Sequence, residues 1–271
     1  MQNQISRKAF KNSPKRITKI NSYFDIYDDL FLPYKNKEII FVEIGVKEGG
    51  SLYMWREFFG PKARIIGVEL NPIAKDLEKE GFEIYIGNQS DKNFWLDFIK
   101  SVGPVDIVLD DGGHTYEQQI ITTEMLISNI KDGGMLVIED CMTSYKNGFG
   151  PRKYSFIEYT KKLIDKINTR EINSKKYKPD YRIWSIRIYN SIVAFIVNKK
   201  AVKIKPDMII RNDNLRRTED YRYNDSYLIK KLYNFKAKLN FLSKIVNLEK
   251  LINMIRNTIM IRKFSAKRYF K

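Results

Sequence analysis

Acidic side chains stand at the ends of two predicted strands of this 271-residue chain, beside its single histidine. Asp110 and Asp111 end one strand, His114 follows them, and Glu139 and Asp140 end the next. Because neighbouring parallel strands end at one edge of a sheet, we expect these four carboxylates to converge. Unpaired, they would repel one another, so a cation is required, and oxygen ligands favour Mg²⁺ or Mn²⁺. In the alternative interpretation, Asp110 or Asp111 caps the following helix.

A second set of residues is suited to an adenosine-containing cofactor. The first strand ends in a glycine-containing loop that leads into a helix, and glycine allows a ligand to approach the backbone closely. An acid at the end of the second strand suits a ribose, and amides after the third suit an adenine edge. The glycines are spaced G-x-x-x-G-G, which does not fit the G-x-G-x-x-G of dinucleotide sites. The candidate cofactor-binding residues are Glu43, Gly45, Gly49, Ser51, Glu69, Asn88, Gln89 and Asp110.

Strands and helices alternate through the middle of the chain. Short β-branched runs predict strands at 39–45, 64–70, 82–86, 106–110 and 135–139, and amphipathic runs predict helices at 51–59, 72–80, 91–102 and 115–130. Lys131–Gly134 is expected to end the last helix. This order predicts a parallel sheet covered on both faces. Runs at 184–189 and 192–197 predict an antiparallel hairpin at its edge.

Charge separates the middle of the chain from its flanks. The net charge is +17, of which residues 1–37 carry +5 and residues 211–271 carry +11. We expect a basic, partly helical N-terminal extension at 1–37, a catalytic domain at 38–200, and a linker with basic amphipathic helices at 201–271, the helical pattern running from about 226 to 264. Part of this charge is explained by the Lys- and Asn-rich composition typical of an AT-rich genome as well as by a specific anionic partner.

Cysteine content and hydropathy bound the environment of the chain. A single cysteine, Cys141, excludes an internal disulfide framework and a multi-cysteine metal site, and fits a reducing cytoplasm. No apolar run approaches 18 residues, and no apolar segment follows the basic N-terminus. We therefore expect a cytoplasmic protein, with the inner face of the membrane as a further possible location.

Three motifs together resemble the metal-dependent sugar O-methyltransferases of macrolide biosynthesis, the macrocin and mycinamicin type. They are FVEIGVKEGGSLYMW at 41–55, DDGGH at 110–114 and VIEDCMTSY at 137–145. The resemblance implies a Rossmann-like class I methyltransferase fold, with a mostly parallel seven-stranded sheet, that uses S-adenosylmethionine and a divalent metal. It makes Asp111 a metal ligand, His114 the general base, and Glu139 and Asp140 the second ligand position. Two departures are Asn88, where relatives read aspartate, and Gly113, where they read serine.

The expected reaction is methylation of a sugar hydroxyl, with a nucleotide-activated sugar for a surface polysaccharide as the expected substrate. Aromatic and basic side chains between the fifth strand and the hairpin are expected to cover that substrate: Tyr145, Phe149, Arg152, Lys153 and Tyr154. A catechol or natural-product hydroxyl is an alternative acceptor. A nucleic-acid methyltransferase is disfavoured, because Asp-Asp-Gly-Gly stands where an Asn/Asp-Pro-Pro-aromatic run would be needed. For the basic C-terminal helices, packing or dimerisation is favoured over attraction to a membrane surface.

Overall fold

The computed structural model describes residues 4–170, 178–204, 207–215, 218, 226–238, 248–263 and 269. The chain divides into two compact units, Met1–Pro206 and Asp207–Lys271. The expected boundary between catalytic domain and extension, at residue 200, remains a prediction.

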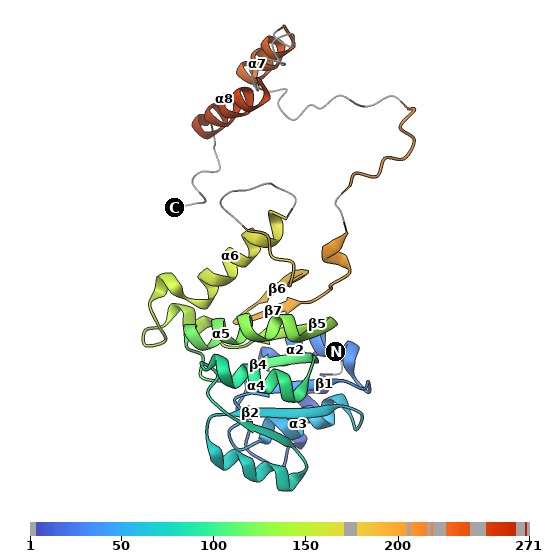
Figure 1. The fold of residues 1–271 in the computed structure, drawn as a ribbon, viewed down its shortest axis with the longest axis vertical. Coiled ribbons are helices and arrows are strands. Elements are labelled where there is room, and N and C mark those ends of the chain that lie inside the picture. The colour runs from blue at the N-terminus through green and yellow to red at the C-terminus, as the bar shows by residue number, and fades with distance from the viewer. Residues whose placement is uncertain are drawn as a thin grey trace. The chain divides into compact units, whose positions relative to one another are not determined.

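The first unit is built on a seven-stranded sheet (Figure 1). Its strands run in the order β3-β2-β1-β4-β5-β7-β6, with β1 to β5 parallel and β7 antiparallel to both β5 and β6. This confirms the Rossmann-like methyltransferase fold and its terminal hairpin. The strands are β1 Ile40–Ile44, β2 Arg64–Glu69, β3 Glu83–Ile86, β4 Val105–Asp110, β5 Ile130–Ile138, β6 Ser185–Tyr189 and β7 Ile192–Ile196.

Alternate side chains of the strands enter two separate cores. Phe41, Leu109 and Val137 pack with side chains of α1 Ile5–Asn12, α2 Tyr23–Phe31 and α3 Gly50–Phe59. Residues one position along, such as Val42, Val108 and Leu136, face the other core, which includes side chains of α4 Lys92–Val102, α5 Tyr116–Leu126 and α6 Phe156–Asn168. Since successive side chains of a strand point to opposite faces, this alternation also decides which way the functional side chains at the strand ends point.

Local predictions were wrong in two places. The helix expected at 72–80 is a run of 3-10 turns, Pro72–Glu80, in which the side chain of Asn71 accepts a hydrogen bond from the amide of Ile73. The segment Lys131–Gly134 does not end a helix but lies inside β5, since α5 stops at Leu126 and a 3-10 turn follows at Ile127–Asn129. Gly134 lets β5 lie close to Asp106 of β4, because a Cβ atom at position 134 would lie 2.2 Å from the Asp106 carbonyl oxygen.

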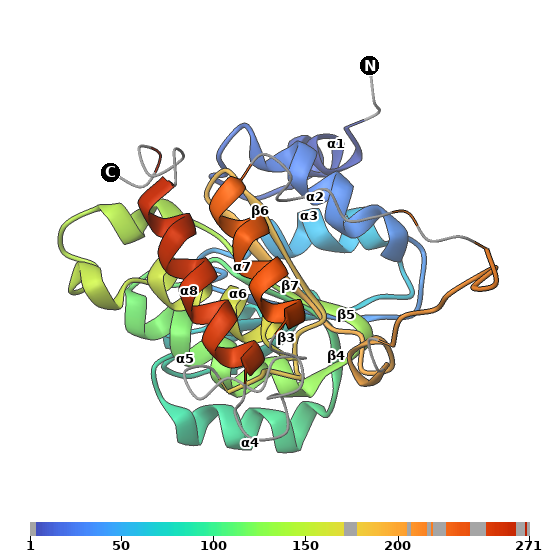
Figure 2. The ribbon, with the colours of Figure 1, turned by 90° about the horizontal axis from the view of Figure 1, so that it is seen from above.

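Within its described residues the second unit contains two helices, α7 Tyr227–Lys238 and α8 Leu248–Lys263, that lie side by side (Figure 2). Residues 239–247 and 264, which the sequence also assigned to helices, lie outside the described residues. Nowhere in the described ranges is a helix long and apolar enough to cross a membrane.

Candidate functional site

Asp111, His114 and Asp140 meet at the carboxyl end of β4 and β5. Each offers one potential ligand atom, and these atoms lie within 4.8 Å of one another. His114 Nε2 is 3.3 Å from Asp140 Oδ2 and 3.8 Å from Asp111 Oδ1. His114 and Asp140 both have a left-handed backbone, with φ of 58° and 54°, which turns them out of the direction of the strands. The three side chains are partly exposed, so a small ligand can reach them.

The other two carboxylates expected in this cluster point elsewhere. Asp110 is buried, and both its carboxylate oxygens accept hydrogen bonds of 2.8 Å from the Gln89 amide. Glu139 is buried on the face of the sheet that α2 and α3 cover, which follows from strand alternation because Val137 faces the same way. The metal-ligand role predicted for Glu139 remains a prediction, and this arrangement does not favour it.

Lys19 neutralises the carboxylates of Asp111, Glu139 and Glu43, and nothing in the sequence pattern had singled it out. Its buried ammonium lies 2.7 Å from Asp111 Oδ2, 3.2 Å from Glu139 Oε2 and 3.7 Å from Glu43 Oε1. Burial alone would lower the pKa of Lys19, but Asp111 and Glu139 outweigh it and raise the pKa well above its usual value. Lys19 therefore remains charged, and the N-terminal segment is part of the site.

Two tyrosines of α2 reinforce the acidic residues from the same side. The Tyr27 hydroxyl donates to Glu139 Oε1 at 2.5 Å, and the Tyr23 hydroxyl donates to Asp140 Oδ1 at 2.6 Å. Burial raises the pKa of both tyrosines, and that of Glu139 to about 8. The signal that could have found these residues is the aromatic periodicity of Tyr23–Phe31, which indicates a helix packed on the sheet.

Two cavities flank the loop after β1 and share Gly45, Lys47 and Asp111. One, of about 190 Å³, is lined by Glu69, Asn88, Gln89 and Gly113 among others. The second, of about 240 Å³, lies between the loop and residues 16–19 and includes Ser51 in its lining. An elongated ligand could therefore extend from Glu69 past Gly45 to Asp111.

The loop residues are positioned as the glycine pattern requires. Gly45 has φ of 85°, and a Cβ atom there would lie 2.3 Å from the Asp111 carbonyl oxygen. Gly49, with φ of 82°, is the N-cap of α3. Glu69 is held in place by the main-chain N–H groups of Lys47, Leu70 and Asn71, which donate to its carboxylate.

Glu43 and Ser51 are, like Asp110 and Gln89, predicted cofactor-binding residues that are engaged within the protein. Glu43 is buried and accepts hydrogen bonds from the Ser51 hydroxyl at 2.6 Å and the Trp55 indole at 3.0 Å. Burial raises the pKa of Glu43. Glu43 and Ser51 therefore stabilise the loop after β1 through contacts inside the protein. Their direct contact with a cofactor remains a prediction, and these hydrogen bonds do not favour it.

The residues expected to cover a substrate lie in the segment after β5. Tyr145 and Tyr154 are exposed, and the Arg152 guanidinium lies 5.7 Å from the centre of the Tyr145 ring. Cys141 is buried, and burial raises the pKa of its thiol, so a nucleophilic role is not favoured.

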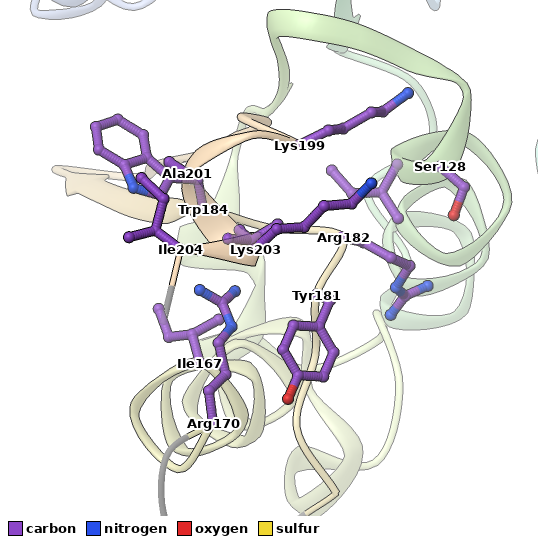
Figure 3. A pocket seen from close by; sticks show the side chains of 12 residues that line it. Ser128, Ile167, Arg170, Tyr181, Arg182, Trp184, Lys199, Ala201, Lys203 and Ile204 are labelled. Carbon is purple, nitrogen blue, oxygen red and sulfur yellow. The ribbon is translucent and has the colours of Figure 1, made fainter. Parts of the chain in front are cut away.

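Another cavity, of about 810 Å³, lies away from this site, and Figure 3 shows the side chains that line it. It lies beside the start of β6 and the end of β7, and Arg170, Arg182, Lys199 and Lys203 contribute to its lining together with Trp184. Arg182 is already paired with Asp180 and Glu124. Among the described residues that line this cavity there is neither a carboxylate nor a histidine.

Known proteins resemble the part of the chain that holds the Asp111, His114 and Asp140 cluster. Residues 42–141 match a family model described as a methyltransferase domain. Mycinamicin VI 2''-O-methyltransferase of Micromonospora griseorubida is 32% identical over 187 residues, which are 63% of this chain and 46% of that protein. Demethylmacrocin O-methyltransferase of Streptomyces fradiae is 30% identical over 63% of this chain and 47% of that protein.

A solved structure shares the fold. The MycE methyltransferase of the mycinamycin pathway, in complex with Mg, SAH and mycinamycin VI, matches with a TM-score of 0.64 and 28% identity. The match covers 78% of this chain and 57% of that one. The chain spans about half the length of the curated relatives that it matches.

Proposed function

We propose that this chain, which contains a methyltransferase domain of the class I fold, transfers a methyl group from S-adenosylmethionine to a sugar hydroxyl with a divalent metal ion. The observation that carries this proposal is the position of Asp111. It belongs both to the Asp111, His114 and Asp140 cluster and to the lining of the two cavities around Gly45. A cofactor in those cavities would lie directly beside the cluster.

The cavities fit the cofactor in shape and in chemistry. Glu69 is suited to accept hydrogen bonds from both ribose hydroxyls, while Asn88 and Gln89 lie on the adenine side. The lack of a Cβ atom on Gly45 leaves room for a ligand against the backbone. The methionine end would then extend toward residues 16–19 and Asp111. S-adenosylmethionine supplies the methyl group as a sulfonium.

The metal fits the donor set of Asp111 and Asp140, whose hard oxygen atoms suit Mg²⁺ or Mn²⁺. A divalent ion held there lowers the pKa of a hydroxyl that approaches it. His114 is placed to take the hydroxyl proton, since its Nε2 atom faces the cluster and an imidazole nitrogen can act as a general base. Tyr23 fixes Asp140, and Lys19 fixes Asp111, so both carboxylates are oriented in advance.

For the acceptor we propose a sugar, which is the moiety named in several of the relatives. Those proteins modify rhamnosyl or olivosyl groups on antibiotics. For this chain, the exposed Tyr145 and Tyr154 beside Arg152 and Lys153 suit a sugar ring that carries a phosphate. A nucleotide-activated sugar of surface-polysaccharide synthesis is therefore the first acceptor to test, ahead of a catechol or a natural product.

The proposal is tested by calorimetric titration of S-adenosylhomocysteine and, separately, of Mg²⁺ or Mn²⁺ into the chelator-treated protein. We expect saturable binding of both, with metal binding lost in Asp111→Asn. Asp97→Asn, at an exposed position on α4, is the matched control and is expected to bind both as the unchanged protein does. Failure of S-adenosylhomocysteine to bind would refute the methyltransferase activity, whereas cofactor binding without metal binding would refute the metal requirement alone.

A further inference from the structure

The C-terminal unit carries a concentration of positive charge that composition alone does not explain. Residues 226–271 contain twelve lysines and arginines but only one of the chain's 32 acidic residues, Glu249. A bias toward lysine codons would act along the whole chain, yet residues 38–210 carry a net charge of only +1. α7 contains four lysines and no acid. The positive charge of the chain is therefore concentrated in this segment and is not offset there by acidic residues.

Large apolar side chains are exposed on both helices of this unit. On α7, Leu228 and Phe235 lie seven residues apart, on one face, and are 46% and 56% exposed. On α8, Leu251, Met254 and Ile255 share a face through i, i+3 and i+4 spacing and are 43%, 61% and 37% exposed. By contrast, Ile229 and Ile252 are both buried. Each helix thus buries one apolar position and presents a second apolar row to the solvent.

We infer that α7 and α8 form a docking surface for an anionic lipid membrane. A basic helix with an apolar row lies in the membrane interface, where the row enters the acyl boundary and the lysines meet the headgroups. Clusters of basic residues on such helices are attracted to anionic lipids, whose surface potential falls off within a Debye length. Because no helix in the described part of the chain is long and apolar enough to span a membrane, the contact is with the surface.

Charge also decides between a membrane and the competing partners. A second copy of this unit would bring two strongly basic surfaces together, and like charges oppose such an interface. An anionic lipid surface neutralises the same charge. Nucleic acid would match the charge, but it offers no apolar phase for Leu251, Met254 and Ile255. The combination of exposed aliphatic rows with lysines is what favours lipid.

The test is co-sedimentation of the full chain with vesicles of phosphatidylcholine alone or mixed with phosphatidylglycerol. We expect binding to the mixed vesicles only, and loss of that binding when the salt concentration is raised from about 0.1 M to about 1 M, which shortens the Debye length from about 10 Å to about 3 Å. Lys230→Glu with Lys231→Glu should weaken binding by about tenfold or more. Phe235→Ser with Met254→Ser should weaken binding to the mixed vesicles at the lower salt concentration.

Matched variants in the first unit serve as controls. Ile73→Ser with Leu96→Ser removes apolar side chains of similar exposure, and Lys199→Glu with Lys200→Glu changes the charge by the same amount. Both controls should bind mixed vesicles as the unchanged protein does. Equal binding to neutral and anionic vesicles, or no binding to either, would overturn the inference. So would a concentration-dependent dimer that Phe235→Ser with Met254→Ser abolishes while vesicle binding is absent, since the surface would then bind a second copy. Circular dichroism of each variant verifies that the fold is intact.

Discussion

The Lys19 ammonium lies 2.7 Å from the Asp111 carboxylate and 3.2 Å from that of Glu139, although 92 and 120 residues separate the partners along the chain. One buried cation thus connects a predicted metal ligand to a buried carboxylate at the end of the neighbouring strand. It does so from a segment that the sequence marked only as a basic extension.

Lys19→Met should destabilise the fold strongly, because it leaves buried carboxylates without their counter-charge. Removing one partner of a buried ion pair costs about 3–5 kcal/mol. The control is Lys15→Met, which breaks a partly exposed pair with Glu80 and should cost about 1 kcal/mol or less. Urea denaturation measures both, and equal losses would show that Lys19 is not the counter-ion of the site.

His114→Ala should abolish most of the methyl transfer but leave metal binding largely intact. Loss of a general base lowers turnover by about 10²–10⁴-fold. The assay is turnover with a methylatable sugar, together with calorimetric titration of Mg²⁺ or Mn²⁺. If His114→Ala lost the metal as completely as Asp111→Asn, the histidine would be a third ligand, in line with its place in the Asp111, His114 and Asp140 cluster.

Glu69→Gln should weaken S-adenosylhomocysteine binding without unfolding the protein. A charged hydrogen bond to the ribose contributes about 1.5–3 kcal/mol, or roughly 10- to 100-fold in affinity. Glu83→Gln, which alters an acid of the neighbouring strand that pairs with Arg64, is the control and should bind normally. Undiminished binding by Glu69→Gln would place the cofactor elsewhere.

Asp180 should make stability depend on pH in the acid range. Burial by itself raises the pKa of Asp180, but hydrogen bonds from Arg182 outweigh it and hold the pKa below its usual value. A lowered pKa in the folded state means that the stabilisation is present above the unfolded pKa of about 3.9 and is lost as the pH falls through the folded value. Asp180→Asn should therefore cost about 1–3 kcal/mol at pH 7 and much less near pH 3. A thermal or urea series across this pH range measures the difference; a constant deficit would contradict the ion pair as its cause.

The sheet, and the edge at which its parallel strands end, were predictable because the evidence for them is local. Runs of β-branched residues mark the strands, and parallel strands must end at one edge, so Glu69, Asp111 and Asp140 were placed correctly at that edge. The face of the sheet toward which each strand side chain points also follows from its position in the strand. Glu43 and Glu139 share strand parity with Phe41 and Val137, so both had to face α2 and α3.

The rest depended on contacts between distant segments. Lys19 and Tyr27 reach Glu139 across 120 and 112 residues, and no periodicity in the sequence relates those positions. The reversed direction of Asp140 arises from its left-handed backbone, which a non-glycine residue adopts rarely. For that reason Asp140 joins Asp111 and His114, whereas Asp110 and Glu139 point elsewhere.

The Lys19 contacts also constrain the order in which the protein matures during synthesis. Lys19 leaves the ribosome long before Asp111 and Glu139 exist, so two of its three carboxylate partners are missing until β4 and β5 have been made and paired. Closing such long loops is slow compared with forming local helices. The N-terminal segment therefore cannot complete its contacts until these strands are made. Nascent chains shorter than about 140 residues should remain open to proteolysis in that segment.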